Sequence, residues 1–197
     1  ELGRANNEIS NRFTLLTSYK AHWFDFGDTT FSFFFESRSG RPFTWAFSND
    51  ANGDGRFGND RLFVPNPGDV QFVDRDGNLD PAGEAAFFQL LANTPSLAEA
   101  QGGIACRNCA RAPRVNQLDF RFIQDLDLKQ YGKLEFFFEI ENVLNLINSD
   151  WGQINEAPFP FAAEPVSFEG IDPTTGLAQY RYSGCLLYTS PSPRDTA

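Results

Sequence analysis

Apolar and polar residues alternate one by one in several separate segments of the chain. In Lys133–Glu141 the even positions are apolar and most odd positions are acidic, and Gln117–Lys129 and Thr29–Arg38 show the same kind of alternation. A period of two gives a β-strand one apolar and one polar face. The apolar positions include Phe31, Phe33, Phe35, Phe120, Phe122, Phe136 and Phe138. The pattern therefore predicts strands with one Phe-rich face and one charged face.

Five strands are expected, at residues of about 11–22, 29–39, 117–129, 133–142 and 177–184. The longer ones match the ~9–11 residues that a tilted strand needs to cross a bilayer. Such a strand can turn its apolar face to lipid and its charged face to a water-filled lumen. We therefore expect an all-β fold: residues 1–184 form the C-terminal part of a large antiparallel transmembrane β-barrel.

The lengths of the connections support the same fold. Asp25-Phe26-Gly27-Asp28 and Gln130-Tyr131-Gly132 read as short hairpin turns, whereas the segments 40–116 and 142–176 are long. Short turns that alternate with long loops are typical of bacterial outer-membrane barrels, whose long loops are extracellular.

The longer of these loops is expected to contain short helices. Asp80 is a helix-capping residue, and Pro81 is suited to the first position of a helix over 82–92. A second short helix is expected after Thr94-Pro95. The first loop is therefore predicted to be ordered.

Composition narrows the class of partner. The net charge is −10, which argues against nucleic acid as a partner, because nucleic-acid binding requires clustered Lys and Arg. No apolar run is long enough for a transmembrane helix.

A chain that starts at Glu1 and contains no Met is expected to be a fragment. Cys185–Asp195 resembles a translated sequencing adapter, so residues 185–197 are interpreted as a non-native tail.

Several motifs in the same order resemble the C-terminal barrel region of Oar-like TonB-dependent receptors. They are Gly40-Arg41-Pro42-Phe43-Thr44, Asp50–Gly55, Asn59–Pro65, Arg107–Pro113, Asn116–Asp119, Glu141–Asn145 and Asp150-Trp151-Gly152. The resemblance covers residues of about 9–184. Arg114 departs from it, because members usually have an aromatic residue after the proline.

The resemblance implies a receptor in the outer membrane of a Gram-negative bacterium. Its members have a plug inside a barrel of about 22 strands, and usually a carboxypeptidase-regulatory-like domain before it. The implied function is energy-coupled import of a scarce, bulky ligand that the loops and plug capture. The implied partners are outer-membrane lipid, the imported ligand and the TonB complex, which acts through N-terminal parts. Trp45, Phe47 and Trp151 are candidate loop aromatics for binding the ligand, or for packing the loops.

Two other functions remain open. The first is a surface adhesin or protein-handling barrel without an import role. The second is a secreted calcium-binding β-sandwich, in which the apolar strand faces would be buried against each other.

A candidate calcium loop lies in the first long segment. Asp50, Asn52 and Asp54 place oxygen ligands at alternate positions, Gly55 permits a sharp turn, and Asp60 is a later ligand. A complete EF-hand is excluded, because Arg61 occupies the position of its last acidic ligand. The alternative is a polar turn that needs no metal.

Cys106 and Cys109 have CxxC spacing. A zinc site would need two more ligands, and a redox motif would need a thioredoxin-like βαβ context. A local disulfide in an oxidising exterior is the favoured interpretation, with pairing to a cysteine elsewhere as the alternative.

The acidic strand face gives no indication of catalysis. It carries Asp119, Asp125, Asp127, Glu135, Glu139 and Glu141, opposite Arg38, Arg121 and Arg181. This arrangement is typical of a solvated lumen with cross-strand pairs. No nucleophile with a histidine partner accompanies these carboxylates, so we predict that the chain is not an enzyme.

Overall fold

The computed structural model describes residues 3–25, 27–148, 154–157, 159–184 and 188–190. The chain forms two compact units, where the sequence predicted one barrel domain. The sheet unit consists of Ile9–Gly40, Pro113–Ile154 and Thr189–Ala197. The loop module consists of Glu1–Glu8, Arg41–Ala112 and Asn155–Tyr188, so most of the two predicted long loops belongs to it.

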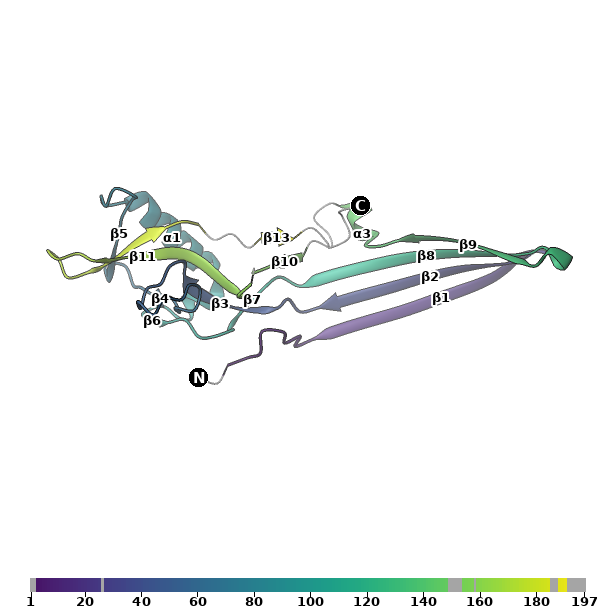
Figure 1. Cartoon of the computed structure of the whole chain (residues 1–197), viewed down its shortest axis with the longest axis horizontal. Coiled ribbons are helices and arrows are strands. Elements are labelled where there is room, and N and C mark those ends of the chain that lie inside the picture. The colour runs from purple at the N-terminus through teal and green to yellow at the C-terminus, as the bar shows by residue number, and fades with distance from the viewer. Residues whose placement is uncertain (1–2, 26, 149–153, 158, 185–187, 191–197) are drawn as a thin grey trace. The chain divides into compact units, whose positions relative to one another are not determined.

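The sheet unit is built on four long antiparallel strands. They are β1 (Arg12–Phe24), β2 (Gly27–Arg38), β8 (Val115–Asp127) and β9 (Lys133–Ile140), in the spatial order β1-β2-β8-β9. Four of the five predicted strands are thus present and lie side by side in chain order (Figure 1). Within the described residues the sheet is open, with β1 and β9 at its edges. A short helix, α3 (Leu144–Ile147), follows β9.

The strand register places the phenylalanines on one face. Phe31 pairs with Phe122, Phe33 with Phe120, and Phe122 in turn with Phe138. Directly paired residues project from the same face of a sheet. The prediction of one shared Phe face is therefore confirmed.

Both predicted hairpin turns connect their strands. Phe24 pairs with Gly27 at the first turn, and a β-carbon at Gly27 would collide with the carbonyl oxygen of Asp125. Glycine therefore lets β2 approach β8 closely. The second turn contains the 3₁₀ turn η1 (Lys129–Tyr131) and ends at Gly132, whose φ of 106° favours glycine.

The fifth predicted strand is present but belongs to the loop module. As β12 (Ala178–Tyr182) it pairs antiparallel with β11 (Ala162–Ile171) and parallel with β5 (Val70–Phe72), not with β9. Its Tyr180 is buried, with 2% of its surface exposed. Short alternating strands occur in half-buried sheets as well as in barrels, so the period of two did not separate the two cases.

The loop module has a mixed sheet with the order β5-β12-β11-β3-β7. Here β3 (Pro42–Phe47) runs parallel to β11 and antiparallel to β7 (Ala110–Arg111). A separate pair joins β4 (Phe63–Val64) to β6 (Gly103–Ile104). The remaining strands are β10 (Ile154–Glu156) and β13 (Tyr188–Ser190). Apart from β12 and β13, these strands lie in segments that were predicted as loops.

Both predicted helices are present in the module. Asp80 caps α1 (Pro81–Asn93): its carboxylate Oδ1 accepts a hydrogen bond of 2.9 Å from the backbone N–H of Gly83. Pro81 occupies the first turn, where its missing N–H has no consequence. The second helix, α2 (Pro95–Ala98), follows directly after Thr94.

The module encloses its own hydrophobic core. Phe87 of α1 is fully buried, and its ring centroid lies 5.3 Å from that of Phe72 on β5. The indole Nε1 of Trp45 donates a 3.0 Å hydrogen bond to Ser96 Oγ. The buried cluster contains Phe43, Trp45, Phe47, Leu62, Val64, Val70, Phe72, Phe87, Leu91, Leu97, Ala105, Ala110, Ala157, Ala163, Val166 and Tyr180.

We expect Phe87→Ala to destabilise the module by about 3–5 kcal/mol, because it removes a buried ring and leaves a cavity. Phe57→Ala is the matched control, since Phe57 is 72% exposed, and it should change the free energy of unfolding by less than about 0.5 kcal/mol. With Trp23 and Trp151 changed to Phe, the fluorescence of Trp45 in a urea titration reports on the module alone. Equal midpoints for the two variants would contradict this core.

The stability of the module is also expected to fall at alkaline pH. Burial raises the pKa of the Tyr180 phenol above its ordinary value of 10.0, and its hydroxyl donates to the backbone oxygen of Phe63. Because the folded-state pKa is higher than the unfolded one, this stability is complete below about pH 10 and is lost above it. Tyr180→Phe should remove this pH dependence while costing about 1 kcal/mol at pH 7. Urea titrations from pH 7 to pH 11 measure both effects.

Candidate functional site

The apolar face of the sheet unit is broad, aromatic and exposed. Tyr19 is 61% exposed, Trp23 59% and Phe136 55%. The rings pack against each other across the strands: Phe33 and Phe120 lie 5.1 Å apart between centroids, and Trp23 and Phe31 lie 5.6 Å apart. Exposed apolar patches of this kind mark surfaces that contact protein or membrane.

Polar side chains stand on this face at both ends of the Phe rows. Thr29 pairs with Gln124, and the Thr29 hydroxyl donates a 2.6 Å hydrogen bond to the Gln124 amide oxygen. The Gln124 amide nitrogen donates to the backbone oxygens of Asp28 and Asp125. Gln124 interrupts the alternation of apolar residues in its strand, and these bonds satisfy its amide.

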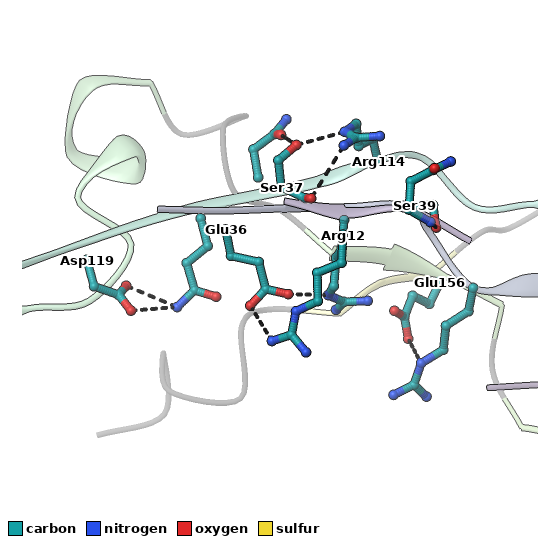
Figure 2. Close-up of polar contacts among 12 residues, drawn as sticks. Arg12, Glu36, Ser37, Ser39, Arg114, Asp119 and Glu156 are labelled. Atoms are coloured by element: carbon teal, nitrogen blue, oxygen red, sulfur yellow. Dashed lines mark hydrogen bonds and ion pairs between the residues drawn. The ribbon is translucent and has the colours of Figure 1, made fainter. Parts of the chain in front are cut away.

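The second polar group lies at the other end of β2. The Ser37 hydroxyl donates to the side-chain oxygen of Asn116 at 2.6 Å and accepts a 2.7 Å bond from Arg114 Nε (Figure 2). Arg114 also donates to the Ser37 carbonyl oxygen. Arg114, the residue before β8, thus ties the start of β8 to the end of β2.

The opposite face carries ion pairs between neighbouring strands. Glu36 lies between two arginines, Arg12 and Arg38 (Figure 2). Its carboxylate lies 3.0 Å from the guanidinium of Arg12 and 3.6 Å from that of Arg38. Near the hairpin end, both Lys20 and His22 lie 2.6 Å from the carboxylate of Asp28. Between these groups, the Ser18 and Ser32 hydroxyls share a 2.9 Å hydrogen bond.

Four apolar side chains interrupt this polar face. Leu16 pairs with Phe34, and Ile123 pairs with Phe137. Leu16 is 72% exposed and Phe137 is 65% exposed. The guanidinium of Arg121 lies 5.5 Å from the centre of the Phe137 ring, a cation–π arrangement. The sequence predicted a charged face. The structure shows a face on which charged and apolar side chains are mixed.

The candidate calcium ligands form a tightly hydrogen-bonded turn in the module. The two oxygens of Asp50 accept from the backbone N–H groups of Gly53, Asp54 and Gly55 at 2.7–3.0 Å. Asp60 is 7% exposed, and it accepts from the backbone N–H of Ala51 and from the side chain of Asn52. Asp50, Asn52, Asp54 and Asp60 therefore belong to one connected loop.

Backbone N–H donors occupy carboxylate oxygens of Asp50 and Asp60 in this loop. Among the described residues no group of three or more His, Cys, Asp or Glu side chains is arranged to hold a metal ion. A second acidic segment of the module, at Asp74, is also a turn: Asp74 Oδ1 accepts from the backbone N–H groups of Asn78 and Asp76, and these bonds hold the pKa of Asp74 below its ordinary value. Calcium binding stays a prediction.

The structure places the other predicted site residues in different environments. Cys106 and Cys109 are joined by a disulfide, with their Cα atoms 5.7 Å apart. Trp45 and Phe47 do not form a ligand surface: they are 4% and 7% exposed, because alternate residues of β3 enter the module core. Trp151 lies outside the described residues. Phe57 and Phe159 are loop aromatics that are exposed, at 72% and 85%.

The structure also brings together residues that the sequence did not single out. A cavity of about 380 Å³ in the loop module is lined by Asn6, Thr44, Gly58, Asn59, Arg61, Arg107, Asn108, Pro160, Phe161 and Ala162. These residues come from distant parts of the chain, so no local spacing indicates the cavity. The local signals are three of the motifs quoted above: Gly40–Thr44 contributes Thr44, Asn59–Pro65 contributes Asn59 and Arg61, and Arg107–Pro113 contributes Arg107 and Asn108.

No protein-family model, curated protein or solved structure matches this chain. Within the described residues, no helix has the length and apolar character needed to span a membrane. The two faces of the sheet unit and the loop module are therefore the features that bear on function.

Calcium titration by calorimetry separates the metal site from the polar turn. If the Asp50–Asp60 loop binds calcium, the full chain takes up the ion and Asp54→Ala removes that uptake, because the variant lacks one of the four ligands. Arg56→Ala is the control, because it changes a neighbouring exposed side chain that is not a predicted ligand. Equal uptake in the chain and in Asp54→Ala would leave the loop as a turn.

Proposed function

We propose that the chain is part of the barrel wall of a TonB-dependent outer-membrane receptor, which imports a bulky ligand by energy-coupled transport. The observation that carries the proposal is the sheet β1-β2-β8-β9. Its strands pair in chain order, one face is aromatic and exposed, and the other face carries ion pairs. Such two-faced meanders are typical of barrels between lipid and a polar lumen.

The dimensions of the apolar face support this assignment. On β2 and β8 the Phe rows lie between the polar pairs Thr29–Gln124 and Ser37–Asn116. About eight residues at ~3.3 Å separate these pairs along a strand, which gives ~26 Å, or ~20 Å along the axis of a barrel tilted by ~40°. An outward apolar band of about 25 Å is characteristic of outer-membrane barrels. Trp23 and Tyr131, which is 82% exposed, lie towards the hairpin turns, where an aromatic girdle is expected.

The mixed polar face fits a plugged lumen. Its ion pairs suit contact with water, whereas Leu16, Phe34 and Phe137 offer apolar contacts to another part of the protein. In the proposed receptor this part is the plug, and the TonB complex acts through N-terminal parts beyond this chain.

The loop module supplies the proposed extracellular surface. Its two long segments follow β2 and β9 along the chain, and a common hydrophobic core orders them. Surface segments held by a core keep a fixed shape, which suits ligand capture. The exposed aromatic rings of Phe57 and Phe159 belong to this surface.

A surface adhesin or protein-handling barrel is the second candidate, since an ordered module with exposed rings also suits capture without import. The coding sequence upstream of Glu1 separates the candidates. A plug domain and a TonB box there support import. A signal peptide followed directly by β-sandwich repeats supports the secreted calcium-binding protein instead.

If the sheet spans a membrane, the same substitution at neighbouring positions should change the folded fraction by very different amounts. Phe33→Arg places a charge on the proposed lipid face near mid-strand and should disfavour folding into phosphatidylcholine vesicles by about 2–4 kcal/mol. Ser32→Arg places the same charge on the polar face and should change the folded fraction little. Protection of the full chain from trypsin, with vesicles present, measures that fraction.

Equal losses in the two variants would show that the faces are not distinguished by lipid. In plain buffer without detergent, the full chain should aggregate through its open strand edges and Phe face. A monodisperse monomer that melts in one sharp step would contradict the membrane assignment.

A further inference from the structure

The cavity of the loop module has an electrostatic character unlike that of the rest of the chain. Among the described residues that line it, Arg61 and Arg107 carry guanidinium groups and none carries a carboxylate, whereas the whole chain has a net charge of −10. Its volume of about 380 Å³ falls within the range of small-molecule sites. A positive cavity in an acidic protein is a place where an organic anion gains Coulomb energy.

The polar wall of the cavity is held rigidly. Asn108 is 2% exposed; its backbone N–H donates to the Thr44 hydroxyl at 2.9 Å, and its amide oxygen accepts from that hydroxyl at 3.1 Å. Its amide nitrogen donates to the backbone oxygen of Arg4 and to the side chain of Asn6. The disulfide between Cys106 and Cys109 encloses Arg107 and Asn108 in a four-residue loop. These bonds fix the shape of the wall before a ligand binds, so little conformational entropy of the wall is lost on binding.

The two arginines differ in their roles. Arg61 lies within the fold: its Nη1 donates to the backbone oxygen of Ala105 at 3.4 Å, and its backbone bridges to Ala46. Arg107 is exposed at the tip of the disulfide loop. A guanidinium offers a planar fork of N–H donors that matches carboxylate and phosphate oxygens.

The opposite wall is apolar and aromatic. Phe161 lines the cavity with a φ of 68°, a left-handed backbone conformation that is rare for a bulky residue. Its ring lies 5.9 Å from that of Phe159, which is 85% exposed. A carboxylate oxygen of Glu164 lies close to Gly58, and burial raises the pKa of the Glu164 carboxyl.

We propose that this cavity binds the carboxylate or phosphate group of an organic molecule whose flat apolar part packs against Phe161. Arg107 holds the anionic group, Arg61 contributes positive charge to the lining, and the wall formed by Phe161 and Pro160 holds the apolar part. All lining residues belong to the loop module, so the inference does not depend on where the sheet unit resides.

Binding of two aromatic anions to the full chain in detergent micelles tests the proposal. Benzoate and phenyl phosphate probe the two anionic groups, benzylamine reverses the charge, and inorganic phosphate lacks the ring. We expect at least one aromatic anion to bind more tightly than both benzylamine and inorganic phosphate. Saturation-transfer NMR titrations give the dissociation constants.

Variants locate the site. Arg107→Gln should weaken binding of the aromatic anion about tenfold, because it removes a charged hydrogen-bond donor at the cavity. Arg75→Gln is the matched control, since Arg75 is exposed elsewhere in the module and lines no part of the cavity; it should change affinity less than twofold. Trp45 fluorescence verifies that each variant retains the folded module.

Several results would overturn the proposal. They are failure of both aromatic anions to bind, equal binding of benzylamine, equal binding of inorganic phosphate, and unchanged affinity in Arg107→Gln. An equal loss of affinity in Arg75→Gln would show that the net charge of the chain, and not the cavity, determines binding. The two proposals can fail separately. If Phe33→Arg and Ser32→Arg lose equally in vesicles but the aromatic anion still binds, the cavity proposal stands and only the membrane assignment is rejected.

Discussion

The pairing of β2 with β8 is the constraint on which the rest of the structure depends. It joins Gly27–Arg38 to Val115–Asp127, strands that are far apart in the chain, and it closes the whole intervening segment as a loop. A slip of one residue in this register would exchange the two faces of β8. The close approach at Gly27 and the polar pairs Thr29–Gln124 and Ser37–Asn116 oppose such a slip.

Closing so long a loop costs conformational entropy, which favourable contacts must offset. The loop module meets this requirement with a core of its own, in which the fully buried ring of Phe87 packs on Phe72. Segments 41–112 and 155–188 share this core, so both long connections are ordered by the same contacts. A rigid module on long connections is a suitable place for ligand binding, and its cavity draws on both segments.

The two units distribute their apolar residues in opposite ways. In the loop module the aromatic residues of β3 and β12 point into a closed core. In the sheet unit the aromatic residues lie on an exposed face, with Trp23, Phe136 and Phe138 each more than half exposed. We interpret the first as the arrangement of a protein in water, and the second as that of a wall against lipid.

The sequence by itself determined the four long strands, their order, their faces and the helix after Asp80, because these depend on local periodicity, turns and capping. It did not place Ala178–Tyr182, Trp45 or Phe47, since a period of two does not say which partner covers the apolar face. Only the tertiary structure decided that parallel pairings build a module from the long segments. The cavity with Arg61 and Arg107 likewise exists only once distant segments meet, because its residues share no spacing along the chain.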